Sequence, residues 1–280
     1  MNSVIKGKVS VAYLGPKGTF CGQAARKQFS CKNVSLIPAL SISEVFKAVE
    51  TGKSKYGVVP IENSLEGSIN VTLDLLLESS LMVCGEVELR IKHNLIVKPG
   101  TNMDMIQFVL SHPQALAQCR TFLNESLPTS ETKEVSSTAK AVEMLQKMDR
   151  SAAIGPETAA LNSEMEILVK GIEDDPNNFT RFFILGKKDA EPSGNDKTSV
   201  IFSAKNIPGA LYRVLEAFAI RDINLSKIES RPQRGKPWEY IFYLDFEGHR
   251  SEEKSKDVFK DMEKKSVFIK VLGSYPKATP

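Results

Sequence analysis

The sequence is poor in the features that identify metal-binding, exported or membrane-bound proteins. Its 280 residues include four cysteines and three histidines, and no two cysteines have the C-x-x-C spacing of a zinc site. The short apolar run that ends at Leu14 is followed by no cleavage-site pattern, and no stretch is long enough to span a bilayer. We therefore expect a cytoplasmic protein with reduced cysteines, no metal ion and no membrane partner.

An excess of charge of one sign is also absent. The chain has 37 basic and 34 acidic residues, a net charge of +3, which is too balanced for the concentrated basic face of a nucleic-acid-binding protein. No G-x-G-x-x-G motif follows an expected strand, so we expect no dinucleotide cofactor. Hydrophobic residues make up 41% of the chain, enough for a core, and the mild positive charge suits a small anionic substrate.

One boundary divides the chain. The segment 187–197, KKDAEPSGNDK, is charged and rich in residues that rarely join a core. We take residues 188–197 as a linker between a larger N-terminal part, 8–187, and a small domain over 198–276.

The N-terminal part alternates strands with helices, which is typical of α/β layering with largely parallel strands. Short apolar runs predict strands at 9–14, 56–61, 87–97, 108–110, 152–154 and 179–185. Helices are predicted over 23–29, from the capping box at Ser41 to Gly52, over 69–77, from Pro113, from the Ser-Ser-Thr run at 136–138 to Met148, and after Pro156.

The small domain has a different order of elements. We expect a strand at 198–204, a helix at 208–219, strands at 225–230 and 239–246, a helix at 251–265 and a strand at 267–272. This β-α-β-β-α-β order predicts a ferredoxin-like domain. The order alone says little about function, because many activities use this fold.

Four loop segments of the N-terminal part carry residues that could hold a ligand. They are G-P-K-G-T-F at 15–20, P-I-E-N-S-L-E-G-S at 60–68, S-H-P-Q-A-L-A-Q-C at 111–119 and N-N-F-T-R-F at 177–182. Backbone N–H groups and polar side chains at such strand-to-helix junctions often face ligands in α/β folds. Each segment alone is equally typical of a tight turn, a helix cap or a structural histidine.

The fourth segment places a hydroxyl and a guanidinium side by side, at Thr180 and Arg181. On a regular strand the two side chains would face opposite ways, whereas an irregular start to the strand could let both contribute to one site. The alternative is a strand edge with an exposed arginine.

Together these segments point to one family. The series G-P-K-G-T-F, P-I-E-N-S-x-x-G-S, S-H-P-Q-A-L-A-Q-C, S-S-T-A-K-A and N-x-T-R-F resembles prephenate dehydratases over residues 9–186. In the small domain, G-A-L-Y at 209–212 and E-S-R-P at 229–232 resemble the phenylalanine-responsive motifs of the family's ACT domain. The resemblance covers nearly the whole chain, with the motifs in the expected order.

The resemblance implies a catalytic domain of the type II periplasmic-binding fold, followed by the ACT domain. Two α/β lobes would flank a cleft, with chain crossings near 81–87 and 172–180. The implied activity is that of a lyase that converts prephenate to phenylpyruvate in L-phenylalanine biosynthesis. Formation of an aromatic ring would drive the reaction, so no cofactor is implied. Arogenate dehydratase, whose substrate carries an amino group in place of the keto group, is the alternative activity, and a non-catalytic amino-acid sensor is a different class of alternative.

The resemblance also implies roles for individual residues. Thr180 would donate a proton to the departing hydroxide or orient it, and Arg181 would bind a substrate carboxylate. The other catalytic candidates are Glu62, Asn63 and Ser64. The substrate-binding candidates are Gly18, Thr19, Ser111, His112, Gln114, Ser137, Thr138 and Phe182, with the helix starts at Thr19 and Thr138 as anion sites.

L-Phenylalanine is the effector that the resemblance implies. Its binding candidates are Asn206, Gly209, Ala210, Leu211, Glu229, Ser230, Arg231 and Pro232. ACT domains commonly bind their ligand at a subunit interface, so we expect a homodimer or homotetramer. Phenylalanine would shift the cleft between two states, and its binding would be coupled reciprocally to substrate binding.

Overall fold

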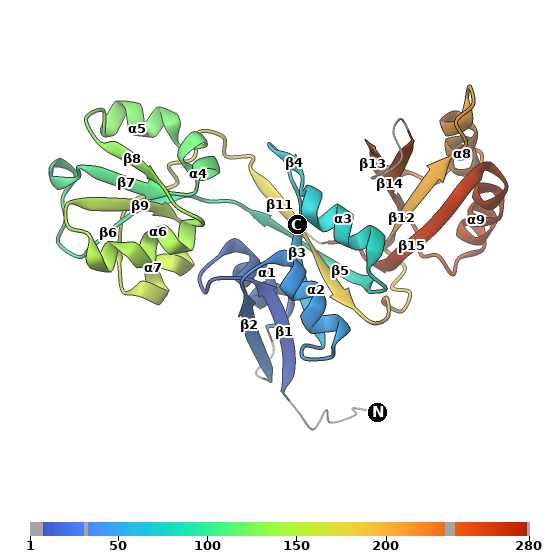
Figure 1. The fold of residues 1–280 in the computed structure, drawn as a ribbon, viewed down its shortest axis with the longest axis horizontal. Helices are drawn as coiled ribbons and strands as arrows, with labels where there is room; N and C mark the ends of the chain where they lie inside the picture. The colour runs from blue at the N-terminus through green and yellow to red at the C-terminus, as the bar shows by residue number, and fades with distance from the viewer. Residues whose placement is uncertain (1–7, 31–32, 233–238, 279–280) are drawn as a thin grey trace.

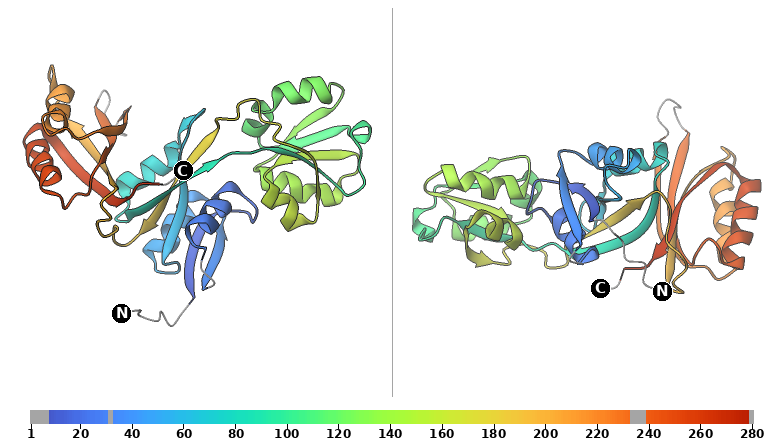
Figure 2. Two further views of the ribbon diagram at one scale, coloured as in Figure 1. Left: turned by 180° about the vertical axis from the view of Figure 1, so that it is seen from behind. Right: turned by 90° about the horizontal axis from the view of Figure 1, so that it is seen from below.

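The computed structural model describes residues 8–30, 33–232 and 239–278. Three units lie in a row along its long axis, two lobes of an N-terminal domain and a C-terminal domain, and Figures 1 and 2 show the same row from three directions. Within the described part of the chain, no helix combines the length and the apolar character needed to cross a membrane.

The first lobe is built on a mixed sheet with strand order β2-β1-β3-β11-β5. β1 pairs in parallel with β2 and β3, whereas β11 is antiparallel to both of its neighbours. The strands are β1 (Val9–Leu14), β2 (Val34–Ala39), β3 (Tyr56–Asn63), β5 (Met82–Arg90) and β11 (Phe179–Gly186), with the short β4 (Gly67–Ser68) beside β3. The helices are α1 (Phe20–Gln28), α2 (Ile42–Glu50) and α3 (Asn70–Glu78).

The Ser41 cap predicted for α2 is confirmed, and the Glu44 side chain reaches back one residue beyond the position that a capping box requires. The Glu44 N–H donates to Ser41 Oγ over 3.2 Å, and the Leu40 N–H donates to the Glu44 carboxylate over 2.8 Å. One N–H group of the first helical turn is therefore capped by Ser41, and the Glu44 carboxylate ties down the residue before the cap.

The second lobe has a five-stranded sheet with order β10-β6-β9-β7-β8. Its strands are β6 (Asn94–Val97), β7 (Phe108–Ser111), β8 (Glu131–Glu134), β9 (Ser151–Gly155) and β10 (Glu166–Lys170). Its helices are α4 (Pro113–Ala117), α5 (Arg120–Ser126), α6 (Thr138–Met144) and α7 (Glu157–Ser163), with 3₁₀ turns η1 (Met103–Met105) and η2 (Leu145–Lys147). Every residue of the central β9 is buried, which fits a strand covered on both faces.

The chain passes from the first lobe to the second later than we expected. Residues 82–90 form β5 and pair with β11 of the first sheet, so the crossing lies at 91–93 rather than near 81–87. The return runs through 171–178, between β10 and β11. The Ile91 N–H donates to the Asn178 carbonyl over 2.7 Å, and the Ile172 N–H donates to the His93 carbonyl over 2.9 Å. The two crossings therefore lie side by side.

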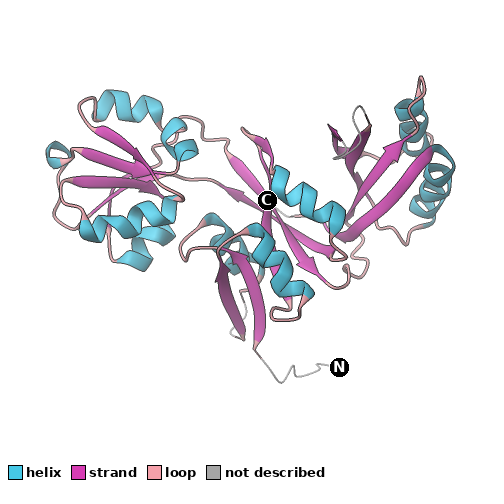
Figure 3. Cartoon of the chain, viewed as in Figure 1, coloured by secondary structure: helices cyan, strands magenta, loops and turns pink. Residues whose placement is uncertain are grey.

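The C-terminal domain has the predicted β-α-β-β-α-β order, and its ferredoxin-like arrangement is confirmed. Its elements are β12 (Asp196–Ala204), α8 (Ala210–Ala219), β13 (Leu225–Pro232), β14 (Tyr240–Glu247), α9 (Glu253–Lys265) and β15 (Ser266–Pro276). The antiparallel sheet has the order β13-β14-β12-β15. Both helices cover its outer face, and the opposite face turns toward the first lobe (Figure 3).

The inner face of this sheet packs tightly on the first lobe. Ile201 and Tyr243 join the same apolar cluster as Leu73 of α3. Lys270 donates to the carbonyls of residues 76, 77 and 79 at the C-terminal end of α3. Its positive charge there interacts favourably with the negative end of the helix dipole. Gly273 lies so close to β5 that a Cβ there would approach the Val83 carbonyl oxygen to 2.1 Å. The two domains are therefore in direct backbone contact.

Candidate active site

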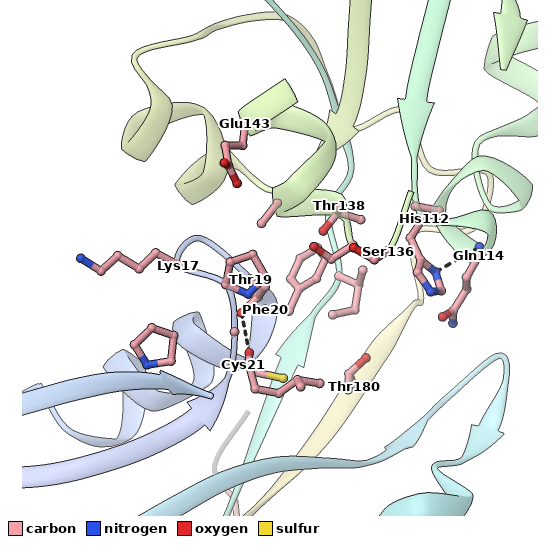
Figure 4. A pocket seen from close by; sticks show the side chains of 18 of the residues that line it. Lys17, Thr19, Phe20, Cys21, His112, Gln114, Ser136, Thr138, Glu143 and Thr180 are labelled. Atoms are coloured by element: carbon pink, nitrogen blue, oxygen red, sulfur yellow. Dashed lines mark hydrogen bonds between the residues drawn. The ribbon is translucent and has the colours of Figure 1, made fainter. Parts of the chain in front are cut away.

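A cavity of about 1010 Å³ lies between the two lobes. Side chains from both lobes surround it, with Thr180 on one side and Ser136, Thr138 and His112 on the other (Figure 4). The lining residues are Leu14, Gly15, Pro16, Lys17, Thr19, Phe20, Cys21, Pro38, Ala39, Leu40, Asn63, Ile91, His93, His112, Gln114, Ala115, Gln118, Ser136, Ser137, Thr138, Ala139, Glu143, Asn162, Ser163 and Thr180.

Two of the predicted catalytic residues meet in this cavity. Thr180 on β11 pairs in register with Asn63 on β3, and Asn63 Nδ2 donates to Thr180 Oγ1 over 2.9 Å. Asn63 Oδ1 accepts the N–H groups of Leu65 and Glu66, each over 3.1 Å, and these bonds fix the orientation of the amide. Among the described residues, none accepts a hydrogen bond from the Thr180 hydroxyl. Its proton is therefore available to a ligand in the cavity.

Three further polar residues extend this pair, and we did not predict them. Asn63 Nδ2 also donates to Asn178 Oδ1 over 2.7 Å, and Asn178 Nδ2 donates to Gln118 Oε1 over 2.9 Å. The ring Nε2 of His93 lies 3.1 Å from the same Gln118 oxygen. Burial lowers the pKa of His93 below its ordinary 6.5, against the opposing effects of Gln118 and Glu173, so the ring is neutral. Gln118 and Asn178 lie inside the loop segments 111–119 and 177–182, and that position was the sign in the sequence that they could belong to the site.

Several predicted substrate-binding residues line the same cavity. Thr19 caps α1, where its hydroxyl accepts the Gly22 N–H. His112 caps α4, with Nδ1 accepting the Gln114 N–H over 3.3 Å, and both side chains reach the cavity wall. Across from Thr19, the start of α6 contributes Ser137 and Thr138. Ser137 is the residue that caps this helix, by accepting the Lys140 N–H.

Four other predicted residues support the walls and do not line the cavity. Ser64 Oγ bridges the Asn177 carbonyl and the Phe179 N–H. Ser111 is fully buried and donates to the Ile154 carbonyl over 2.7 Å. Phe182 lies in the core of the first lobe, and Gly18 turns with a left-handed φ of 91° against Ala159 of the second lobe. All four residues make their contacts with other parts of the protein, so they support the shape of the cavity without facing a ligand.

Arg181 and Glu62 point away from the cavity, toward the C-terminal domain. Arg181 forms ion pairs with Glu86 over 2.7 Å and with Asp245 over 2.5 Å, and its side chain is only 10% exposed. The Glu62 carboxylate lies 2.9 Å from Lys227 Nζ. In this structure Arg181 therefore has its partners outside the cavity and does not line it, contrary to the predicted contact with a substrate carboxylate. Successive side chains of a strand point to opposite faces of the sheet. Asn63 and Thr180 face the cleft, so their neighbours Glu62 and Arg181 face the C-terminal domain.

The charge inside the cavity is low. Among the described residues that line it, Lys17 is the only lysine or arginine and Glu143 the only acid. Neutral donors make up most of its polar lining, from amides, hydroxyls and imidazoles. An anion bound here would be held chiefly by hydrogen bonds, with one ammonium group at the edge.

The predicted effector residues divide between two surfaces of the C-terminal domain. Glu229 hydrogen-bonds Ser68 on β4, and Arg231 forms an ion pair with Asp74 on α3 over 2.7 Å. These two side chains therefore link the E-S-R-P segment to the catalytic domain. Asn206, Gly209, Ser230 and Pro232 are exposed, while Ala210 is buried and Leu211 half-buried at the start of α8.

Comparison with known proteins agrees with this architecture. The prephenate dehydratase family matches residues 11–190, and the ACT domain family matches residues 198–263. The chain belongs to the prephenate dehydratase family. It is 42% identical to "Prephenate dehydratase" of Methanocaldococcus jannaschii, over 95% of this chain and 98% of that protein. It is 45% identical to "Bifunctional chorismate mutase/prephenate dehydratase" of Aquifex aeolicus, over 98% of this chain and 75% of that protein.

Members of the family also share the fold and differ in the substrates that they are named for. The crystal structure of prephenate dehydratase from Arthrobacter aurescens in complex with L-Phe superposes with a TM-score of 0.89 and 33% identity, covering 96% of this chain and 90% of that one. "Arogenate dehydratase/prephenate dehydratase 2" of Arabidopsis thaliana is 38% identical over 97% of this chain and 74% of that protein.

Proposed function

We propose that this chain catalyses the conversion of prephenate to phenylpyruvate in L-phenylalanine biosynthesis, in the cytoplasm. The observation that supports this most strongly is the 2.9 Å hydrogen bond from Asn63 to Thr180 Oγ1 inside the interlobe cavity, in a chain of this family. That bond leaves a hydroxyl proton directed at the space where a small substrate would sit.

The chemistry sets what the site must supply. The bond from the ring to its carboxylate breaks and releases CO2, the electron pair moves through the ring, and the C–O bond on the opposite side breaks. One proton converts the departing hydroxide to water. The gain of an aromatic ring drives these steps, so the protein needs no electron sink. Its task is to orient the dianion and to deliver that proton.

Thr180 delivers the proton in this scheme, and its oxygen takes a proton back from water once the products have left. A free alcohol is a weak acid, but the Asn63 N–H donates to Thr180 Oγ1 and stabilises negative charge that develops on the oxygen. The Asn63 amide is itself held by two backbone N–H groups, so it does not need to reorganise during the reaction.

Polar side chains elsewhere in the cavity lining bind the two carboxylates. Lys17 supplies a positive charge, and Gln114, Ser137 and Thr138 supply neutral donors across the cavity. A carboxylate surrounded by neutral donors is less well solvated than in water, which favours loss of CO2. The same donors could bind the two carboxylates of arogenate, which differs from prephenate in carrying an amino group in place of the keto group.

Phenylalanine regulates the enzyme through the C-terminal domain. Support comes from the ACT domain match and from the related Arthrobacter structure, described as a complex with L-Phe. We place the effector near the exposed Asn206, Gly209, Ser230 and Pro232, at an interface in a homodimer or homotetramer. Glu229 and Arg231 of the same segment contact β4 and α3, and β4 pairs with the end of β3 that carries Asn63. Effector binding at β13 therefore has a direct route to the active site.

One assay tests the proposed function. Purified protein is given prephenate and arogenate in parallel, with and without phenylalanine, and phenylpyruvate and phenylalanine are measured as products. We expect turnover of prephenate to exceed that of arogenate and to respond to phenylalanine. A preference for arogenate would reassign the substrate. Phenylalanine binding with no turnover of either acid would instead identify a non-catalytic sensor.

A further inference from the structure

We propose that His93 is a positioning residue that anchors the far end of a hydrogen-bond relay ending on Thr180. The relay consists of His93, Gln118, Asn178, Asn63 and Thr180, joined by contacts of 3.1, 2.9, 2.7 and 2.9 Å. The inference rests on the proposed function, because it assigns Thr180 the proton-donating role. It adds a residue that acts on Thr180 through three intervening side chains.

The direction of every bond in the relay follows from two backbone groups. The N–H groups of Leu65 and Glu66 occupy Asn63 Oδ1, so the Asn63 end that faces Thr180 and Asn178 must be the N–H donor. Asn178 then accepts with Oδ1 and donates with Nδ2, and Gln118 must accept with Oε1. The ring Nε2 beside that oxygen must carry a proton, because two acceptors would repel each other. His93 is therefore the Nε2–H tautomer.

His93 is built to hold this position. The residue is only 2% exposed, and its backbone N–H donates to the Glu173 carboxylate over 2.8 Å. The ring of Phe20 packs edge-on against the imidazole, with centroids 5.7 Å apart. The imidazole therefore has little freedom to rotate away from Gln118.

The relay also connects all the parts of the catalytic domain. Asn63 belongs to the first lobe and Gln118 follows α4 in the second, whereas His93 and Asn178 lie in the two crossings between them. Thr180 is thereby oriented with reference to both lobes.

Two buried polar atoms at the His93 end of the relay have no hydrogen-bond partner among the described residues. Within the described part of the chain, His93 Nδ1 and Gln118 Nε2 are buried and make no hydrogen bond. Unsatisfied buried polar atoms are costly. Both residues line the cavity, so this polar end of the relay lies at the active site.

The first test needs no variant. Nitrogen-15 NMR of the parent protein should show His93 with a protonated Nε2 and an unprotonated Nδ1. An Nδ1-protonated ring, or a charged ring at pH 7, would overturn the relay, since Nε2 could then not act as the fixed neutral donor that Gln118 requires.

The second test is a kinetic cycle. We expect His93→Leu to lower kcat by about 10- to 100-fold with KM changed little, because Thr180 loses its orientation. His93→Gln keeps an N–H donor of similar reach and should recover most of the loss. In a Thr180→Ala background, His93→Leu should cause no further loss of kcat, because two residues that act as one unit are not additive.

Each outcome decides a different question. Losses from His93→Leu that multiply with those from Thr180→Ala, or that His93→Gln does not recover, would overturn the relay while the parent enzyme stays active. If the parent turns over neither acid, the proposed function fails and the inference falls with it. Should His93→Leu not fold, the comparison of His93→Gln with the parent and the NMR result still decide.

Discussion

Thr180 and Arg181 are consecutive residues on β11 that serve opposite faces of one sheet. Thr180 Oγ1 accepts a hydrogen bond from Asn63 in the cleft, and the Arg181 guanidinium lies 2.5 Å from the Asp245 carboxylate of the C-terminal domain. The same guanidinium donates to the Tyr275 hydroxyl over 3.0 Å. A shift of the C-terminal domain would therefore act directly on the strand that carries the reactive hydroxyl.

Replacement of Arg181 by Met tests whether this residue joins the domains or binds substrate. The variant leaves Glu86 and Asp245 in a buried site without their shared partner. We expect the free energy of unfolding to fall by about 3–5 kcal/mol, the usual cost of breaking a buried ion pair. Denaturant unfolding measures this loss.

Arg90→Met is the matched control, because Arg90 is exposed at the end of β5. Its effect on unfolding should stay within about 0.5 kcal/mol. If Arg181→Met kept its stability and only raised KM, the residue would be a substrate ligand after all.

The strands that we could predict from the sequence lie mainly inside the sheets, and those that we missed lie at their edges. β2, β8 and β10 are each the terminal strand of a sheet. β2 contains Pro38, which an edge strand tolerates, and β8 reads Glu-Thr-Lys-Glu, with no apolar residue to mark it. An edge strand buries less, so its sequence carries a weaker pattern.

The catalytic residues were predictable as motifs, but their partners were not. Asn63 and Thr180 are 117 positions apart, and Gln118 lies 60 positions from Asn178. Only the fold brings such residues together. Period-2 alternation did predict that Arg181 could face away from Thr180, yet its partner Asp245 belongs to another domain and leaves no trace in the local pattern.

Gly273→Ala tests the direct contact between β15 and β5. The added Cβ would lie 2.1 Å from the Val83 carbonyl oxygen, and the glycine has a φ of 149° that other residues rarely adopt. We expect a loss of about 3 kcal/mol or more in the free energy of unfolding, because overpacking and backbone strain add.

The control for this variant is Gly100→Ala. Gly100 also has a positive φ, of 81°, but nothing lies within 4 Å of the Cβ position. Strain alone should cost about 1 kcal/mol. Equal losses in the two variants would show that the domains are not in close contact at Gly273.

The buried ring of His93 predicts how stability depends on pH. Burial lowers its pKa in the folded protein, whereas the unfolded chain titrates near 6.5. Between these two pKa values the unfolded chain binds more protons, so the free energy of unfolding has its full value above pH 6.5, falls as the pH drops from 6.5 toward the folded pKa, and levels off below it. The groups that face the ring are Gln118, the Phe20 ring and the nearby Glu173 carboxylate, which opposes the shift only in part.

Urea unfolding of the parent and of His93→Gln between about pH 7.5 and 5.5 would measure this dependence, the pH limits being set about one unit either side of the ordinary histidine pKa. The parent should lose more stability on acidification than the variant. Parallel pH profiles would mean that His93 is not desolvated in the native state.

The role of Thr180 is tested most directly by kcat for prephenate in Thr180→Ala, compared with Thr180→Ser. We expect Thr180→Ala to fold normally and to lose about 10²- to 10⁴-fold in kcat, the contribution of a positioned proton donor, while Thr180→Ser, which keeps the hydroxyl, retains most activity. Turnover by Thr180→Ala close to that of the parent enzyme would contradict this role.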